Sequence, residues 1–294
     1  MIGDLGRLQG GHVAANGVEF RVLRAGDHGP LALCLHGFPD SAYTWRELLP
    51  ALAERGYRAV APFMRGYAPT GLAPDARYDV SALADDAIAL HQALGGDERA
   101  VIIGHDWGAD AAYGAGALAP ARWRRVVALA VPPGVLDQRL YSDFEQLKRS
   151  FYVFLLQTSL AEEVVGANDM EFIDRLWLEW SPGFDSTHLR ALAKASLAGA
   201  ENLRAAIAYY QQTAVGADAA DPYGMGRSGT PSVPPQPTLY LHGERDGCIV
   251  SRLVVDIVDH LSPGSRMKII EGAGHFLHVE RPAAVNAEIL TFLA

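Results

Sequence analysis

An aspartate stands at the centre of the segment GHDWG, residues 104–108, directly after the apolar run Ala100–Ile103. Glycines two residues before and two residues after Asp106 allow a sharp turn between a strand and a helix, which is the setting of an exposed nucleophile. A carboxylate is already ionised at neutral pH, so it can attack a saturated carbon without a base to remove a proton. The segment therefore predicts an enzyme that forms an ester between Asp106 and its substrate.

The alternative interpretation of Asp106 is a cap of the following helix. Two later segments favour catalysis over capping. In GERD, residues 243–246, Asp246 follows a predicted strand by five residues, and in GAGH, residues 272–275, His275 follows another predicted strand. A lone histidine is usually structural, but the order nucleophile, acid, histidine along the chain favours a catalytic group. We therefore expect His275 to act as a general base that Asp246 orients.

Two backbone groups complete the expected site. The segment HGFP, residues 36–39, follows the apolar strand Leu31–Leu35 and is expected to lie beside the nucleophile turn. We expect the N–H groups of Phe38 and Trp107 to hold the oxyanion that forms when the ester is hydrolysed. We expect His36 to anchor this loop by hydrogen bonds, and Pro39 to fix its turn, with a cis bond as one way to do so.

Other polar residues near these segments are assigned lesser roles. We expect Glu244 to be a surface charge, and His278 to lie behind the catalytic groups or in solvent. The sequence has no HExxH segment, no cysteine–histidine cluster, no phosphate loop with a lysine, and no GxGxxG after an early strand. We therefore expect neither a metal nor a cofactor.

The elements that carry these residues alternate between strand and helix. Apolar runs without alternation, typical of strands buried on both faces of a parallel sheet, lie at 31–35, 57–60, 100–103 and 126–131. Helical patterns lie at 44–55, 79–94 and 108–118. This order predicts an α/β fold with a mostly parallel, doubly wound sheet, whose functional residues lie at the carboxyl ends of the strands.

The pattern changes between residues 136 and 215, where the chain is aromatic and helical, with turns at 166–169 and 181–186. Residues 216–237 contain five prolines and four glycines, which predicts an irregular linker. Strands at 238–241 and 266–270 and helices at 250–261 and 282–293 then complete the sheet. We expect a core of residues 1–135 and 238–294, interrupted by a helical cap, residues 136–215, and the linker 216–237.

The composition limits the class of protein. The 294 residues include 25 basic and 34 acidic side chains, a formal net charge of −9, which argues against a nucleic-acid binder. No apolar run reaches the roughly 20 residues that span a bilayer, and the first residues do not have the pattern of a secretory leader. Cys34 and Cys248 give no disulfide framework. These features predict a cytoplasmic protein.

With these segments, the sequence resembles the α/β-hydrolase superfamily and, within it, the epoxide hydrolases. The resemblance covers nearly the whole chain and rests on HGFPDSAYTWR (36–46), FMRGYAPTG (63–71), GHDWG (104–108), GERD (243–246) and GAGHFLHVERP (272–282). Esterases and lipases of the superfamily have serine where this chain has Asp106. The related haloalkane dehalogenases tend to have asparagine at the place of Phe38, and fluoroacetate dehalogenases usually have arginine at the place of Trp107.

The resemblance implies a helical cap with two tyrosines that hydrogen-bond the epoxide oxygen and protonate it as the ring opens. Tyr210 matches the later of the two, with Tyr209 as the adjacent alternative. At the place of the earlier tyrosine this chain has Leu155. Tyr152 lies almost one helical turn upstream and is the candidate to replace it. The alternative for Tyr152 is a place in the aromatic core of the cap.

The leading hypothesis is a hydrolase that opens a small apolar epoxide with water to a vicinal diol, without nucleic-acid or membrane partners, in a homodimer or a monomer. We expect Phe38, Trp107 and Trp180 to line the substrate pocket, although Trp177 and Trp180 are equally suited to the core of the cap. The first alternative is a dehalogenase with the same nucleophile, in which the Trp107 indole binds the halide. The second is a non-enzymatic ligand-binding relative.

Overall fold

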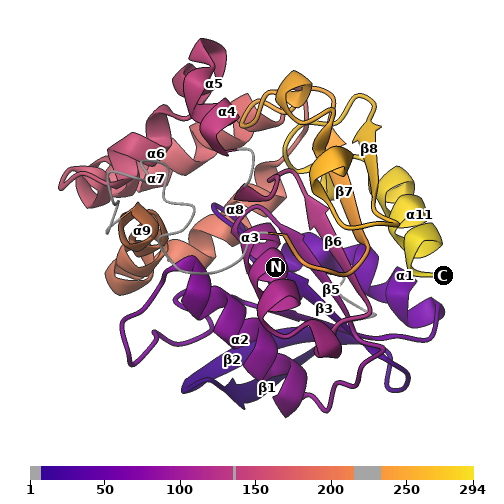
Figure 1. Ribbon diagram of the computed structural model, residues 1–294. Helices are drawn as coiled ribbons and strands as arrows, with labels where there is room; N and C mark the ends of the chain where they lie inside the picture. The colour runs from indigo at the N-terminus through magenta and orange to yellow at the C-terminus, as the bar shows by residue number, and fades with distance from the viewer. Residues whose placement is uncertain (1–7, 135–136, 215–232) are drawn as a thin grey trace.

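The central strands of the sheet are apolar along their whole length because helices cover both of their faces. The computed structural model describes residues 8–134, 137–214 and 233–294 (Figure 1). Eight strands form one sheet in the order β1-β2-β4-β3-β5-β6-β7-β8. Their bounds are Gln9–Ala15 (β1), Val18–Ala25 (β2), Leu31–Leu35 (β3), Arg58–Pro62 (β4), Val101–His105 (β5), Arg125–Leu129 (β6), Thr238–Gly243 (β7) and Arg266–Ile270 (β8).

Two pairs of helices bury the two faces of this sheet. Helices α2 (Val80–Ala93) and α3 (Trp107–Leu118) pack in one buried cluster, and α1 (Leu48–Glu54) and α11 (Pro282–Leu293) pack in another. Successive side chains of β3 alternate between them, with Leu33 in the first cluster and Cys34 in the second. The strands from β4 and β3 through β8 pair in parallel, which confirms the predicted α/β fold.

The first two strands form an antiparallel hairpin that the sequence analysis missed. β1 pairs with β2 across the two residues Asn16 and Gly17, with Ala15 opposite Val18. Both turn residues have positive φ, 46° and 74°, as an Asn-Gly hairpin turn requires. This dipeptide is therefore the sequence signal that identifies the hairpin. β2 also runs antiparallel to β4, so the sheet is mixed at this edge.

Two predicted helices differ from the structure. The predicted helix at 250–261 is wrong, since these residues form two 3₁₀ turns, Ser251–Leu253 and Ile257–His260. Four β-branched residues at 254, 255, 257 and 258 lose side-chain freedom in an α-helix, which disfavours it. The predicted helix at 44–55 is divided into a 3₁₀ turn, Ala42–Arg46, and α1. Pro50 has no N–H to donate to the Arg46 carbonyl one turn earlier, so the helix is not continuous from residue 44, and α1 begins separately at Leu48.

Among residues 137–214, which the structure describes, six further helices lie between β6 and β7 in the chain and gather on one side of the sheet (Figure 1). They are α4 (Asp137–Ser142), α5 (Phe144–Arg149), α6 (Phe151–Leu156), α7 (Ala161–Trp180), α8 (Thr187–Leu197) and α9 (Ala200–Ala214). The turn predicted at 166–169 is a break within α7, where residues 167–170 leave the helical conformation. Of the predicted linker, residues 216–232 lie outside the described residues. The domain boundaries themselves stay a prediction.

The helices of this group include no membrane-spanning segment. In the described ranges, no helix has both the length and the apolar character that crossing a bilayer requires.

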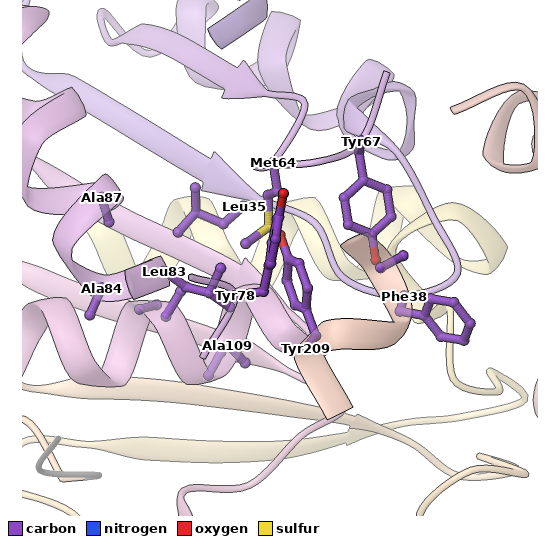
Figure 2. Packing of buried hydrophobic residues seen from close by; sticks show 14 of the residues in the cluster. Leu35, Phe38, Met64, Tyr67, Tyr78, Leu83, Ala84, Ala87, Ala109 and Tyr209 are labelled. Atoms are coloured by element: carbon purple, nitrogen blue, oxygen red, sulfur yellow. The ribbon is translucent and has the colours of Figure 1, made fainter. Parts of the chain in front are cut away.

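Helix α9 is fixed to the sheet by one of its aromatic side chains. The hydroxyl of Tyr209 donates to the carbonyl oxygen of Arg65, 2.8 Å away, and its ring stacks on Tyr78 with centroids 6.0 Å apart. Figure 2 shows Tyr209 close to Tyr78 and Leu83 within the core cluster. The core therefore fixes which face of α9 is buried, and with it the direction of the next side chain, Tyr210.

Gly108, in the first turn of α3, gives a test of the contact between this helix and β3. A Cβ at Gly108 would lie 2.1 Å from the Leu35 carbonyl oxygen, whereas a Cβ at the helical Gly166 would meet only the Leu203 side chain, at 3.5 Å. We expect Gly108→Ala to lower the free energy of unfolding by about 3 kcal/mol or more. Gly166→Ala, the control, should change it by less than about 1 kcal/mol. Denaturant unfolding measures both, and equal stability of the two variants would contradict this account.

Candidate active site

Asp106 occupies a strained turn between β5 and α3. Its φ is 53° and its ψ is −125°, a region that residues other than glycine rarely adopt. The turn is tight because strand and helix meet through glycines: a Cβ at Gly104 would lie 1.9 Å from the Gly108 carbonyl oxygen. In the described part of the chain, the Asp106 side chain makes no capping hydrogen bond to α3. This geometry disfavours the alternative interpretation of Asp106 as a helix cap.

Three of the residues singled out from the sequence meet at the carboxyl ends of β5, β7 and β8. Nε2 of His275 lies 3.6 Å from Oδ2 of Asp106, and Nδ1 of His275 lies 3.0 Å from Oδ2 of Asp246. The other oxygen of Asp246 accepts hydrogen bonds from the N–H groups of Cys248 and Ile249, at 2.7 and 2.9 Å. The acid is therefore held in place while it faces the histidine, which is the geometry of an orienting group.

The HGFP loop supplies a backbone donor to the same carboxylate. The Phe38 N–H donates to Oδ1 of Asp106 at 2.7 Å. Gly37 permits this approach, because a Cβ there would lie 2.1 Å from the same oxygen. The Trp107 N–H belongs to the first turn of α3, where N–H groups lack an intrahelical acceptor. As expected, His36 anchors the loop: its Nε2 accepts the Met64 N–H at 3.0 Å. The Phe38–Pro39 bond is cis.

The charges around His275 determine its protonation. Burial lowers the pKa of His275, but the charges of Asp246 and Asp106 and the hydrogen bond to Asp246 raise it, with a net value of about 10. Burial raises the pKa of Asp246, yet the histidine charges beside it bring that pKa below its usual value. At neutral pH, His275 is thus a cation between two carboxylates. It can accept a proton only after one of those carboxylates loses its charge.

Tyr210, rather than Tyr209, faces the nucleophile. The Tyr210 ring packs edge-on against Phe38 and Trp107, with centroids 5.4 and 4.9 Å apart. Burial raises the pKa of Tyr210 well above 10, and the Asp106 charge raises it further. The Tyr209 hydroxyl instead points into the core and donates to the Arg65 carbonyl. Tyr210 is therefore a protonated phenol beside the carboxylate of Asp106.

Tyr152 reaches the same region, but its hydroxyl has a sulfur partner. The oxygen lies 3.3 Å from Sγ of Cys248, and the Tyr152 and Tyr210 ring centroids are 5.8 Å apart. The Trp180 ring packs against both Tyr152 and His275, each at 4.9 Å. Leu155 on the same helix is only partly buried. The sequence analysis considered Cys248 only as giving no disulfide framework with Cys34, and it gave no signal of the contact between Cys248 and Tyr152.

Several smaller assignments are also decided by the structure. Trp177 of α7 packs against the α/β core: its ring stacks on Phe276, and its Nε1–H donates to the Pro39 carbonyl at 2.7 Å. Glu244 is exposed, and its carboxylate accepts the Gly272 N–H at 2.8 Å. His278 is 2% exposed and lies behind the catalytic groups, not in solvent.

Comparison with known proteins places this site in a family. Residues 30–282 match the family model described as alpha/beta hydrolase fold. The chain is 31% identical to epoxide hydrolase A of Mycobacterium tuberculosis over 96% of both sequences. It is 31% identical to epoxide hydrolase 3 of Xenopus tropicalis over 95% of this chain and 75% of that one. The crystal structure of epoxide hydrolase A from Mycobacterium thermoresistibile has a TM-score of 0.76 and 25% identity, covering 97% of this chain and 98% of that one.

Removing the charge of Asp106 tests the electrostatic coupling in this site. In Asp106→Asn, the pKa of His275 should fall from about 10 by more than about one unit, because a neighbouring carboxylate no longer favours the imidazolium. The histidine would then become neutral at a pH where the wild type is still charged. Titration of ¹⁵N-labelled histidine by NMR measures the shift. Asp97→Asn, at a partly exposed position far from the site in the sequence, is the control. An unchanged pKa of His275 in Asp106→Asn would refute the coupling.

Proposed function

The chain belongs to the epoxide hydrolases of the α/β-hydrolase fold family, and from this premise we propose that Asp106 opens the epoxide ring by nucleophilic attack. The enzyme adds water to an epoxide and releases a diol. The observation that carries the proposal is the convergence on one carboxylate of a histidine at 3.6 Å, a backbone donor at 2.7 Å and the buried ring of Tyr210.

In the first step, a carboxylate oxygen of Asp106 forms a bond to a ring carbon while the bond from that carbon to the epoxide oxygen breaks. The electron pair of the broken bond goes to the oxygen, which takes a proton from Tyr210. The high pKa of this buried phenol keeps the proton in place until the alkoxide, a stronger base, develops beside it. Tyr152, whose ring centroid lies 5.8 Å from that of Tyr210, is the second candidate donor.

In the second step, water cleaves the ester. Esterification removes the Asp106 charge, which is one of the causes that hold the proton on His275. The proton of His275 then goes to the phenolate left at Tyr210, which restores the phenol and leaves His275 neutral. His275 takes a proton from water, and the hydroxide attacks the carbonyl carbon of the ester. The Phe38 N–H, which donates to the carboxylate at 2.7 Å before the reaction, and the Trp107 N–H stabilise the oxyanion. Its collapse breaks the bond to the leaving oxygen, which ends with the proton of the added hydroxyl group, so that the diol is released and the carboxylate is restored.

The phenol beside the nucleophile favours epoxide opening over dehalogenation. An alkoxide needs a proton as it leaves carbon, whereas a halide leaves without one. The Trp107 indole, the expected halide donor of the alternative, packs edge-on against Tyr210, with ring centroids 4.9 Å apart. A pocket lined by Phe38, Trp107 and Trp180 under a cap of residues 136–215 forms part of this proposal. A homodimer and a cytoplasmic location stay predictions.

The covalent intermediate gives the decisive test. In His275→Gln, we expect the ester to form but not to be hydrolysed, because the general base is missing. Intact mass spectrometry after incubation with an epoxide should show the added mass of the whole epoxide, and digestion should place it on the peptide that contains Asp106. The exposed His260→Gln serves as the control and should show no stable adduct. An adduct on another residue, or a mass that implies loss of halide, would overturn the scheme.

The proton donor can be tested with three tyrosine variants. We expect Tyr210→Phe to slow ester formation by about a hundredfold or more, since general acid catalysis typically contributes this much. Tyr152→Phe should have a smaller effect because its hydroxyl also contacts Cys248. Tyr209→Phe, which removes the hydroxyl that anchors α9 to the Arg65 carbonyl, should slow the reaction less than Tyr210→Phe, because the donor hydroxyl of Tyr210 is still present. Single-turnover measurements compare them, and a larger effect at Tyr209 than at Tyr210 would reject the assignment.

A further inference from the structure

The segment GAGHFLHVERP carries an acidic side chain that the proposed reaction does not use. Glu280 is the last residue of α10 (Leu277–Glu280), which follows the loop of His275. Its carboxylate accepts two hydrogen bonds, from the Gly274 N–H at 2.8 Å and from the Ser181 hydroxyl at 2.5 Å. Because Ser181 directly follows α7, Glu280 joins the histidine loop to the cap.

Three successive backbone N–H groups of the histidine loop have acceptors in this contact. They are the N–H groups of Gly274, which donates to Glu280 at 2.8 Å, of His275, which donates to the Trp180 carbonyl at 2.9 Å, and of Phe276, which donates to the Ser181 hydroxyl oxygen at 3.2 Å. Ser181 therefore acts in both directions: its hydroxyl hydrogen goes to Glu280, and its oxygen accepts an N–H. The backbone of the general base is thus held by the end of α7 and by Glu280.

This contact is closely packed and shielded from solvent. Ser181 is 1% exposed, and a Cβ at Gly274 would lie 2.6 Å from Cα of Ser181. A glycine is therefore needed for the two segments to come this close. An N–H group that loses its acceptor in such a place cannot easily find water in exchange, which is costly. The loop is expected to shift when one of these acceptors is removed.

The other two members of the site are held by different groups. Two backbone N–H groups, those of Cys248 and Ile249, hold Asp246, and the Phe38 N–H holds Asp106. Ser181 and Glu280 thus act on the loop of the base.

The proton donor of the first step is also anchored elsewhere. Tyr210 lies on α9, and Tyr209 fixes this helix to the Arg65 carbonyl at 2.8 Å. The groups that form the ester and the group that hydrolyses it are therefore positioned by separate contacts.

We propose that Ser181 and Glu280 are positioning residues of the general base, which hold the His275 loop against the end of α7 for hydrolysis of the ester. Nε2 of His275 has to meet water beside the esterified Asp106 while Nδ1 keeps its contact with Asp246 at 3.0 Å. A misplacement of about 1 Å can cost about a hundredfold in rate. Formation of the ester does not use the base, so it depends much less on this pair.

Glu280→Gln tests the pair with a small change of shape. The amide has one acceptor oxygen, so it keeps one of the two hydrogen bonds and loses the other. We expect hydrolysis of the ester to slow by about tenfold or more, while the rate of ester formation changes by less than about twofold. Single-turnover reactions, quenched at intervals and followed by intact mass spectrometry, measure both rates. Equal hydrolysis rates in the wild type and Glu280→Gln would overturn the proposal.

Glu244→Gln is the matched control. The Glu244 carboxylate accepts the N–H of Gly272 in the same loop, at 2.8 Å, but it is exposed and makes this contact from the end of β7. Its replacement should leave both rates within about twofold of the wild type. A loss of hydrolysis in Glu244→Gln as large as that in Glu280→Gln would overturn the proposal, because any carboxylate on the loop would then have the same effect.

Ser181→Ala separates the hydrogen bonds from the charge. This variant retains the charge of Glu280 but removes the hydroxyl between it and Phe276. Hydrolysis should again slow more than ester formation. If Ser181→Ala hydrolyses the ester at the wild-type rate, the effect of Glu280 is one of charge and the proposal fails. Denaturant unfolding shows which variants fold, and Ser181→Ala carries the test if Glu280→Gln does not.

The double variant shows whether the two residues act as one unit. Because either change breaks the same hydrogen bond, Ser181→Ala with Glu280→Gln should slow hydrolysis by less than the product of the two single effects. A loss equal to that product would mean that the residues act independently, which contradicts the proposal.

Amide hydrogen exchange reads the position of the loop without substrate. In Ser181→Ala and Glu280→Gln, exchange at Gly274, His275 and Phe276 should be faster than in the wild type, with exchange in β5 unchanged. Unchanged exchange in the loop of both folded variants would overturn the proposal. The kinetic role of the pair rests on the proposed function, whose own failure is distinct: it would appear as the absence of an ester in His275→Gln.

Discussion

A carboxylate buried in a strained turn is the constraint on which the rest of the structure depends. Asp106 is 5% exposed and has a φ of 53°, and an unpaired charge in such a place is costly. The Phe38 N–H and the His275 imidazolium offset that cost, at 2.7 and 3.6 Å. Both partners come from loops at the carboxyl ends of other strands, so the parallel sheet is what brings them to the turn.

The cap helps to hold the catalytic loops in place, in addition to covering the site. At the end of α7, the carbonyl oxygen of Trp180 accepts hydrogen bonds from the N–H groups of His275 and Gly247, at 2.9 and 3.1 Å. These two loops carry the base and the acid. A Cβ at Gly274 would lie 2.6 Å from the same carbonyl oxygen, so the packing there is close. A displacement of α7 would therefore move the catalytic loops as well as the pocket wall.

The charges of the two carboxylates beside His275 determine the order of the two steps in the proposed reaction. Two carboxylates hold a proton on His275 in the resting state, and only esterification of Asp106 removes one of them. The histidine is thus unavailable as a base before the intermediate exists and becomes available once it has formed.

The sequence by itself determined the α/β core and singled out Asp106, Asp246 and His275. The core and these three residues follow from local signals, namely apolar runs of strand length, helical periodicity, and glycines at sharp turns. A local signal was also present for the missed hairpin, in Asn16 and Gly17. The error at 250–261 came from a periodicity that tertiary packing and β-branched residues overruled.

Only the tertiary structure decided which side chains meet across the fold. Tyr209 and Tyr210 are adjacent on one helix, and the Arg65 carbonyl, which takes the Tyr209 hydroxyl, turns Tyr210 toward the nucleophile. The contact of Tyr152 with Cys248 joins residues 96 positions apart, and Asp40 and His278 meet from opposite ends of the chain. Such pairings depend on how whole elements pack, whereas periodicity and turn residues report only the local backbone.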